Sequence, residues 1–243
     1  MQTLVLLVAA IALSGCGGPG PTASSAAAPE TTQPPAGTGL AYTCGGEIRF
    51  DPAVLNGPAG AETQPGPAFD ELRRVLADSP DLPPAGWIVI GATPERVEFV
   101  APGQGDELSW VAVGQAGGTW SAEGWGGCRP HAALDGLNLA EWWLDPNEPR
   151  PGPDDTTFDA VVTERECASG KPMGARLQPP LILYQADAVI VVFGAVPPPG
   201  QAHECPSNPP SRVTVELREP LGERALLDGS VFPPADATEE RGF

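Results

Sequence analysis

The sequence predicts an α+β fold that is mainly β, with a short helix on an antiparallel sheet, a second antiparallel β half and two disulfides. Three observations lead to this class. One stretch, 67–78, places its apolar residues at helical spacing, whereas the other apolar stretches are short and strand-like, with a clear period of two at 96–100 and 212–218. Four cysteines also remain after a segment typical of an exported lipoprotein.

Residues 1–15 are predicted to be a lipoprotein signal peptide. The apolar run Leu4 to Leu13 fits the h-region of a secretory signal and is too short to cross a bilayer as a helix. It is followed by Leu13-Ser14-Gly15-Cys16, which resembles the bacterial lipobox and makes Cys16 the expected site of lipidation. The alternative is an ordinary signal peptide with an incidental cysteine.

Residues 16–39 are predicted to combine the lipidated cysteine with a disordered tether. Positions 17–39 hold five Gly, five Pro, five Ala and one charged residue, Glu30. Such a composition cannot bury enough apolar surface to offset the entropy lost on ordering. A flexible chain of this length spans roughly 26 Å on average, which would hold the following domain clear of lipid headgroups.

The first half of the body, 40–150, is predicted to be a helix packed on an antiparallel sheet. In the helix 67–78, Phe69, Leu72 and Val75 share one face, and Pro80 ends the element. The expected strands are 87–91, 96–100, 108–114 and 119–125, with a further short strand at 137–144. A turn at 115–118 is expected to join the last two strands of the sheet into a hairpin.

The second half, 151–235, is predicted to be all-β, and a proline-rich stretch at 145–153 separates it from the first. The expected strands are 158–165, 181–184, 188–196 and 212–218. The segment 188–196 is apolar almost throughout, which is typical of a central strand covered on both faces. Residues 236–243 are expected to form a frayed acidic tail.

The charge of the chain excludes two classes of partner. There are 31 acidic and 13 basic residues, so the formal net charge is −18. Nucleic acid and anionic lipid surfaces would both be repelled. The acidic surface is interpreted as a means of solubility outside the cell, with an acidic docking surface as the alternative.

The four body cysteines are expected to form two disulfides, Cys44–Cys128 and Cys167–Cys205. Four cysteines allow three connectivities, and the sequence alone does not choose between them. The stated pairing is favoured because each bridge then closes within one half of the chain. No CxxC motif is present, and this argues against a zinc site.

The sequence gives little support to a nucleophilic active site or to a zinc site. The sequence has no Gly-x-Ser-x-Gly motif, and the oxidised cysteines would supply no thiolate. His131 and His203 each lie near a cysteine in an expected loop, and both are interpreted as solvated or hydrogen-bonded loop residues. No catalytic residue, metal site or cofactor is therefore predicted.

The acidic residues allow two further kinds of site, a calcium site and a pair of catalytic carboxylates. One loop region concentrates oxygen ligands suited to calcium, against the simpler interpretation of a solvated acidic loop. Its members are Asp145, Asn147, Glu148, Asp154 and Asp155. Glu164 and Glu166 would share one face of a strand, and their backbones would lie roughly 6–7 Å apart. That spacing would suit a carboxylate-dependent hydrolase.

Six tryptophans stand out in a chain with few aromatic residues. On a strand, Trp142 and Trp143 would point to opposite faces, so one of them would be available to stack on a sugar ring or to anchor a partner. The alternative is that both belong to the core.

Several segments together resemble an uncharacterised family of actinobacterial lipoproteins. They are the lipobox, 124–130, 143–146, 162–170, 205–210 and 219–229. The resemblance implies a protein at the extracytoplasmic face of the cell membrane, held by lipid on Cys16, and brings no activity with it. The expected function is a non-catalytic binding or interaction module at the cell envelope, whose partner is an envelope protein, a glycan or a small molecule. The alternatives are a hydrolase acting on envelope material and a structural envelope protein.

Overall fold

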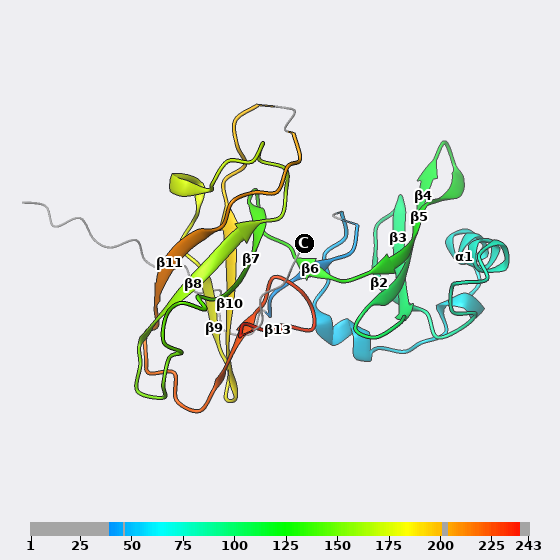
Figure 1. The fold of residues 1–243 in the computed structure, drawn as a ribbon. Coiled ribbons are helices and arrows are strands. Elements are labelled where there is room, and N and C mark those ends of the chain that lie inside the picture. The colour runs from blue at the N-terminus through cyan, green and yellow to red at the C-terminus, as the bar shows by residue number, and fades with distance from the viewer. Residues whose placement is uncertain (1–38, 46, 201–203, 239–243) are drawn as a thin grey trace, which may run out of the picture. The chain divides into compact units, whose positions relative to one another are not determined.

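Strands in two larger sheets and one two-stranded sheet make up most of the fold (Figure 1). A computed structural model describes residues 39–45, 47–200 and 204–238. The predicted signal peptide, Cys16, the predicted tether up to residue 38, His203 and the last five residues lie outside the described ranges. The mainly β fold with one α-helix and two disulfides, Cys44–Cys128 and Cys167–Cys205, is confirmed.

The first larger sheet has four antiparallel strands in the order β2-β3-β4-β5. Their bounds are β2 Ile88–Ala92, β3 Arg96–Pro102, β4 Leu108–Ala116 and β5 Thr119–Cys128. The β4–β5 hairpin turns at Gly117 and Gly118, whose φ angles of 59° and 83° are readily adopted by glycine. This is the turn that the sequence predicted at 115–118.

Helix α1, Pro67–Asp78, packs on one face of this sheet (Figure 1). Proline at its first position has the φ angle that a helix requires and has no N–H that would need a partner. Leu72 and Val75 of the helix pack with Phe99 of β3 and Val111 of β4 in one buried cluster. The predicted helix is confirmed with the same bounds.

In its described residues, the segment between residue 39 and helix α1 contains three short elements. It contains β1 Tyr42–Thr43 and two 3₁₀ helices, η1 Pro52–Asn56 and η2 Ala61–Thr63. Strand β1 pairs with β6, His131–Ala132. Tyr42 lies in a buried cluster that also contains Val100 from the first sheet and Val192 from the second, so the described body shares one core across its sheets.

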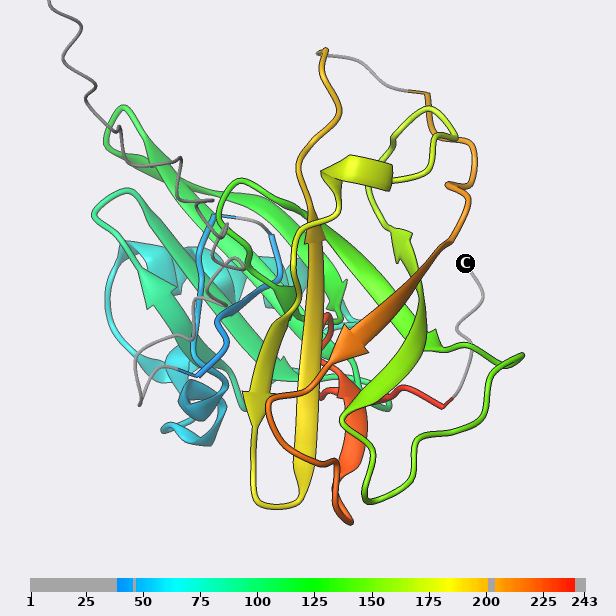
Figure 2. The ribbon, with the colours of Figure 1, turned by 90° about the vertical axis from the view of Figure 1, so that its left-hand side faces the viewer.

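The second larger sheet has seven strands in the order β11-β8-β7-β10-β12-β13, with β9 also pairing with β10 (Figure 2). The bounds are β7 Asn138–Leu144, β8 Thr157–Glu164, β9 Leu181–Tyr184, β10 Ala188–Ala195, β11 Ser211–Glu216, β12 Ala225–Asp228 and β13 Ala235–Asp236. A third 3₁₀ helix, η3, spans Gly174–Arg176. All eight residues of β10 are buried, as its continuous apolar sequence predicts.

Three expectations about the second half are corrected. Strand β7 was assigned to the first half, but it pairs with β8 and β10, so the proline-rich stretch 145–153 lies in a loop within the second sheet. The β10–β12 pair is parallel, which a wholly antiparallel half would not contain. Residues 236–238 are not frayed, because β13 pairs with β12 and Ala237 is fully buried.

No helix among the described residues combines the length and the apolar character needed to span a membrane.

Candidate functional site

Trp142 and Trp143, the residues expected to offer a stacking surface, are both buried. The exposed fractions are 1% for Trp142 and 8% for Trp143. The indole of Trp142 stacks on Phe158 at 5.4 Å between ring centroids, and its Nε1 donates a hydrogen bond of 2.9 Å to the carbonyl of Val191. The prediction of an exposed ring at this pair is wrong, and the alternative of core packing holds because the seven-stranded sheet is covered on both faces of β7.

The exposed aromatic side chain is instead Trp125, on β5. It is 53% exposed, and Val196 is the other large apolar side chain found exposed among the described residues. Trp125 lies opposite Val111 of β4 in the register of the hairpin. Glycines at 124, 126 and 127 surround it in the sequence, so no neighbouring side chain along β5 covers the ring. That run of glycines around a tryptophan is the sequence signal that the prediction missed.

Trp125 lines a cleft of about 700 Å³. Three segments form its walls: residues 78–83 at the end of α1 and after it, residues 102–109 around the β3–β4 turn, and residues 125–127 of β5. This volume lies in the usual range for small-molecule sites, about 300–1,000 Å³. The cleft therefore combines an exposed indole with enough room for a ligand.

The acidic side chains at the cleft are Asp78, Asp81 and Glu107, and none of its lining residues is basic. Asp78 accepts a hydrogen bond of 2.9 Å from Arg74 Nη1. Asp81 and Glu107 are exposed, and neither forms an ion pair with another residue in the described ranges. Two carboxylates thus remain uncompensated beside the indole.

Gly103 and Gly127, which both line the cleft, lie close to Glu107. A Cβ added at Gly127 would lie 3.0 Å from Glu107 Oε2, and one added at Gly103 would lie 2.7 Å from the carbonyl oxygen of Glu107. At Gly103 the close atom belongs to the backbone and cannot easily move aside, whereas at Gly127 it is the end of a flexible side chain. Glycine is therefore required by the local packing at 103 rather than at 127.

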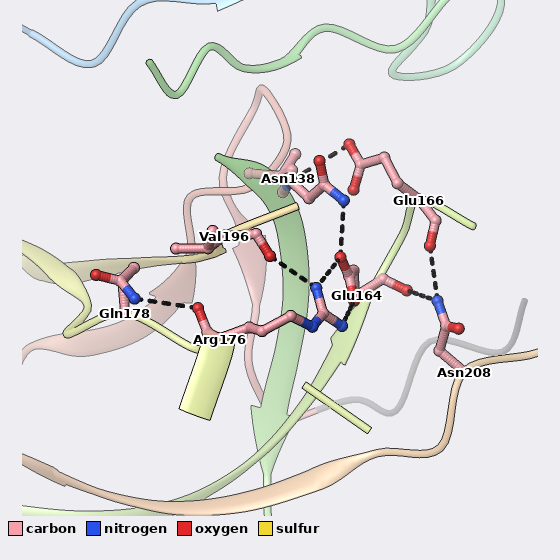
Figure 3. Close-up of polar contacts among 8 residues, drawn as sticks. Asn138, Glu164, Glu166, Arg176, Gln178, Val196 and Asn208 are labelled. Atoms are coloured by element: carbon pink, nitrogen blue, oxygen red, sulfur yellow. Dashed lines mark hydrogen bonds and ion pairs between the residues drawn. The ribbon is translucent and has the colours of Figure 1, made fainter. Parts of the chain in front are cut away.

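Glu164 and Glu166, the candidate hydrolytic pair, lie in a different place and do not suit that role (Figure 3). The side chain of Glu164 is fully buried, and both of its oxygens accept hydrogen bonds from Arg176, at 2.9 and 2.5 Å. Asn138 Nδ2 donates a third hydrogen bond, at 2.7 Å. A carboxylate held in this way has no oxygen available for a substrate.

Glu166 is also engaged. Burial is the main cause that raises the pKa of its carboxyl, and its Oε1 accepts a hydrogen bond of 3.3 Å from the backbone N–H of Leu139. Asn208 Nδ2 donates to the carbonyl oxygens of Glu164 and Glu166, at 3.1 and 2.7 Å, and fixes the chain before the Cys167–Cys205 bridge. The adjoining cavity of about 170 Å³ is smaller than a usual ligand site.

The expected calcium loop is organised by other contacts. Asp145 pairs with Arg212 and accepts hydrogen bonds from the backbone N–H and the side-chain amide of Asn147, at 2.9 and 3.0 Å. The hydrogen bond from the Asn147 backbone is the main cause that lowers the pKa of Asp145. Within the described residues, no group of three or more His, Cys, Asp or Glu side chains is placed to hold a metal ion.

His131 is half-buried on β6, and burial is the main cause that lowers the pKa of its imidazole. It therefore belongs to the short β1–β6 pairing rather than to a solvated loop. Its hydrogen bond with the Arg129 backbone acts in the opposite direction on the pKa.

A further buried polar group has a structural role. Asp228 is fully buried, and its two oxygens accept hydrogen bonds from the N–H and the hydroxyl of Ser230, at 2.8 and 2.7 Å. Nearby, Tyr42 OH donates to the carbonyl of Gly229 at 3.3 Å, and burial raises the pKa of this phenol. The Tyr42 contact attaches the N-terminal segment of the body to the residue that follows β12.

The comparisons with known proteins add no relative. Neither family models, curated proteins nor solved structures give a match to this chain. The two disulfides are typical of proteins outside the cytoplasm, and they indicate an extracytoplasmic location.

Proposed function

We propose that this protein is a lipid-anchored, extracytoplasmic binding module that takes its ligand in the Trp125 cleft without chemically altering it. The observation that carries the proposal is the exposure of Trp125 in a cleft of about 700 Å³. Trp87, Trp142 and Trp143 are buried, so the chain generally packs its tryptophans. An exposed indole beside a cavity is suited to stacking on a ligand.

The hydrolase alternative has weaker support. It depends on paired carboxylates, and the oxygens of Glu164 are already bound by Arg176 and Asn138. At the cleft itself, Asp81 and Glu107 are both exposed, and among the described residues no other acidic side chain is shown to pair with either of them for acid–base catalysis. Binding without catalysis is the simpler account of this arrangement.

The anchor is proposed on the sequence of residues 13–16 and on the resemblance to actinobacterial lipoproteins. The extracytoplasmic disulfides are consistent with it. Replacement of Cys16 by Ala is expected to release the protein from membranes into the soluble fraction. Unchanged membrane fractionation of the variant would refute the anchor.

The binding role is tested with the full-length protein and saturation-transfer NMR against defined probes: an N-acetylglucosamine tetramer, spermidine and a capped trilysine peptide. We expect at least one probe to bind the native protein and to lose its signal with Trp125→Ala. Val196→Ala is the matched control, because it truncates the other exposed apolar side chain, outside the cleft. If every probe behaves alike with the native protein and Trp125→Ala, the proposed site is wrong.

A further inference from the structure

The charge of the Trp125 cleft restricts the ligand that it would accept. Asp78, Asp81 and Glu107 line it, and no lysine, arginine or histidine is among its lining residues. The whole chain adds a formal net charge of −18. An anionic ligand would therefore meet repulsion both at the site and on approach.

Two of these carboxylates are available to pair with a ligand. Asp78 is held by Arg74, whereas Asp81 and Glu107 have no ion-pair partner in the described part of the chain. Elsewhere in the same half, Glu98 and Glu123 both pair with Arg96. The cleft thus places two carboxylates, which form no ion pair within the described residues, around the same space as an exposed aromatic face.

An indole and carboxylates attract the same kind of group. The face of tryptophan binds an ammonium or guanidinium group through the ring quadrupole, and it does so better than the face of tyrosine or phenylalanine. Carboxylates accept charge-assisted hydrogen bonds from these donors. A neutral sugar would also stack on Trp125, but it would leave the charges of Asp81 and Glu107 uncompensated.

We infer that the ligand of the Trp125 cleft is an organic cation, whose ammonium or guanidinium group stacks on Trp125 and pairs with Asp81 and Glu107. The inference rests on the proposed binding function and specifies its ligand class. The cation would belong either to a short basic peptide segment or to a free polyamine, and both present the same chemistry.

The test is isothermal titration calorimetry with the full-length protein at low and high ionic strength. The probes are a capped trilysine peptide, the same peptide with all its amines acetylated, spermidine as a polyamine of the same charge, and an N-acetylglucosamine tetramer. We expect both cations to bind, with affinity falling as salt is added, because exposed charges are screened. Acetylation is expected to lower the affinity of the peptide about tenfold, because the acetylated amines can form neither the ion pairs nor the cation contact with the indole.

Variants separate the cleft from the general acidity of the surface. Asp81→Asn and Glu107→Gln should each weaken cation binding about two- to five-fold. Trp125→Ala should weaken it about five-fold or more, and Trp125→Phe less. Asp187→Asn is the matched control, since it removes the same charge in the exposed β9–β10 turn and should leave the affinity unchanged.

Each other outcome is decisive. Equal affinity for the native and acetylated peptides, or equal losses with Asp187→Asn and the cleft variants, would overturn the cation inference. Binding of the sugar tetramer in a Trp125-dependent manner, without binding of either cation, would overturn it and leave the binding function standing. If no probe binds in a Trp125-dependent manner, both proposals fail. A preference between the peptide and spermidine identifies the source of the cation.

Discussion

Replacing Arg176 with methionine would leave the carboxylate of Glu164 buried without its counter-ion. The side chain of Glu164 is fully buried and that of Arg176 is 19% exposed, so water offers little compensation. Arg176 donates hydrogen bonds to both oxygens of Glu164, and Asn138 donates another, so the variant would lose both contacts with the guanidinium (Figure 3). Removal of one partner of a buried ion pair costs about 3–5 kcal/mol. For a body of this size, that free energy corresponds to a fall in Tm of roughly 10 °C.

The assay is urea unfolding of the native protein, Arg176→Met, Glu164→Gln and the double variant. We expect the double variant to be more stable than Arg176→Met, because the amide of glutamine carries no charge to leave unpaired. Asp135→Asn provides the control, since it removes the ion pair between Arg49 and an aspartate that is 91% exposed and should change stability little. A loss below about 1 kcal/mol in Arg176→Met, or a double variant less stable than that single variant, would refute this reasoning.

Three further predictions concern packing, crosslinks and pH. Trp142→Ala should destabilise the protein by about 3–5 kcal/mol, while Trp125→Ala should cost less than about 1 kcal/mol, as measured by urea unfolding. Replacing Cys44 and Cys128 together by Ala should cost about 2–5 kcal/mol, because their bridge closes a long loop, with a sequence separation of 84. Hydrogen bonding from Arg74 lowers the pKa of Glu71 below its ordinary 4.5, so its contribution to stability is present above that pH and is lost as the pH falls through the folded value. Glu71→Gln should therefore be less stable than the native protein at neutral pH, with the difference shrinking in acid; a constant difference across the acid range would contradict this assignment.

Local patterns predicted most of the elements. The helix 67–78 was found because its apolar spacing and the proline at position 80 agree on its extent. Strands such as 181–184 and 188–195 were found because their composition suits only buried or half-buried strands. These signals are carried by neighbouring residues, so a single sequence contains them in full.

Pairing between distant segments was harder to predict. Nothing within 138–144 shows that this strand joins β8 and β10 rather than the earlier sheet, since its short, largely apolar sequence suits either partner. The parallel β10–β12 pair and the two-residue strands β1, β6 and β13 were missed for the same reason. Such short elements depend on the surfaces to which they are added and carry almost no periodicity of their own.

The candidate site shows the same limit. Trp142 and Trp143 were favoured because adjacent residues on a strand face opposite ways, but β7 is an inner strand of its sheet and both faces are covered. Trp125 lies on β5, at the edge of the four-stranded sheet, where neighbouring glycines leave its ring exposed. Whether a tryptophan is buried therefore depended on strand order, which the sequence does not reveal.

The Cys44–Cys128 bridge closes directly beside one wall of the Trp125 cleft. Gly126 and Gly127 form part of one wall, and glycine loses more conformational entropy on ordering than any other residue. Cys128 follows them directly and is covalently joined to Cys44, which lies in the segment before the helix. A binding site held in place before the ligand arrives loses less affinity to the ordering of its walls. If the proposed binding function is correct, reduction of this bridge should therefore lower the affinity of the cleft for its ligand. Hydrogen-exchange protection of the distant strand β10 should change less.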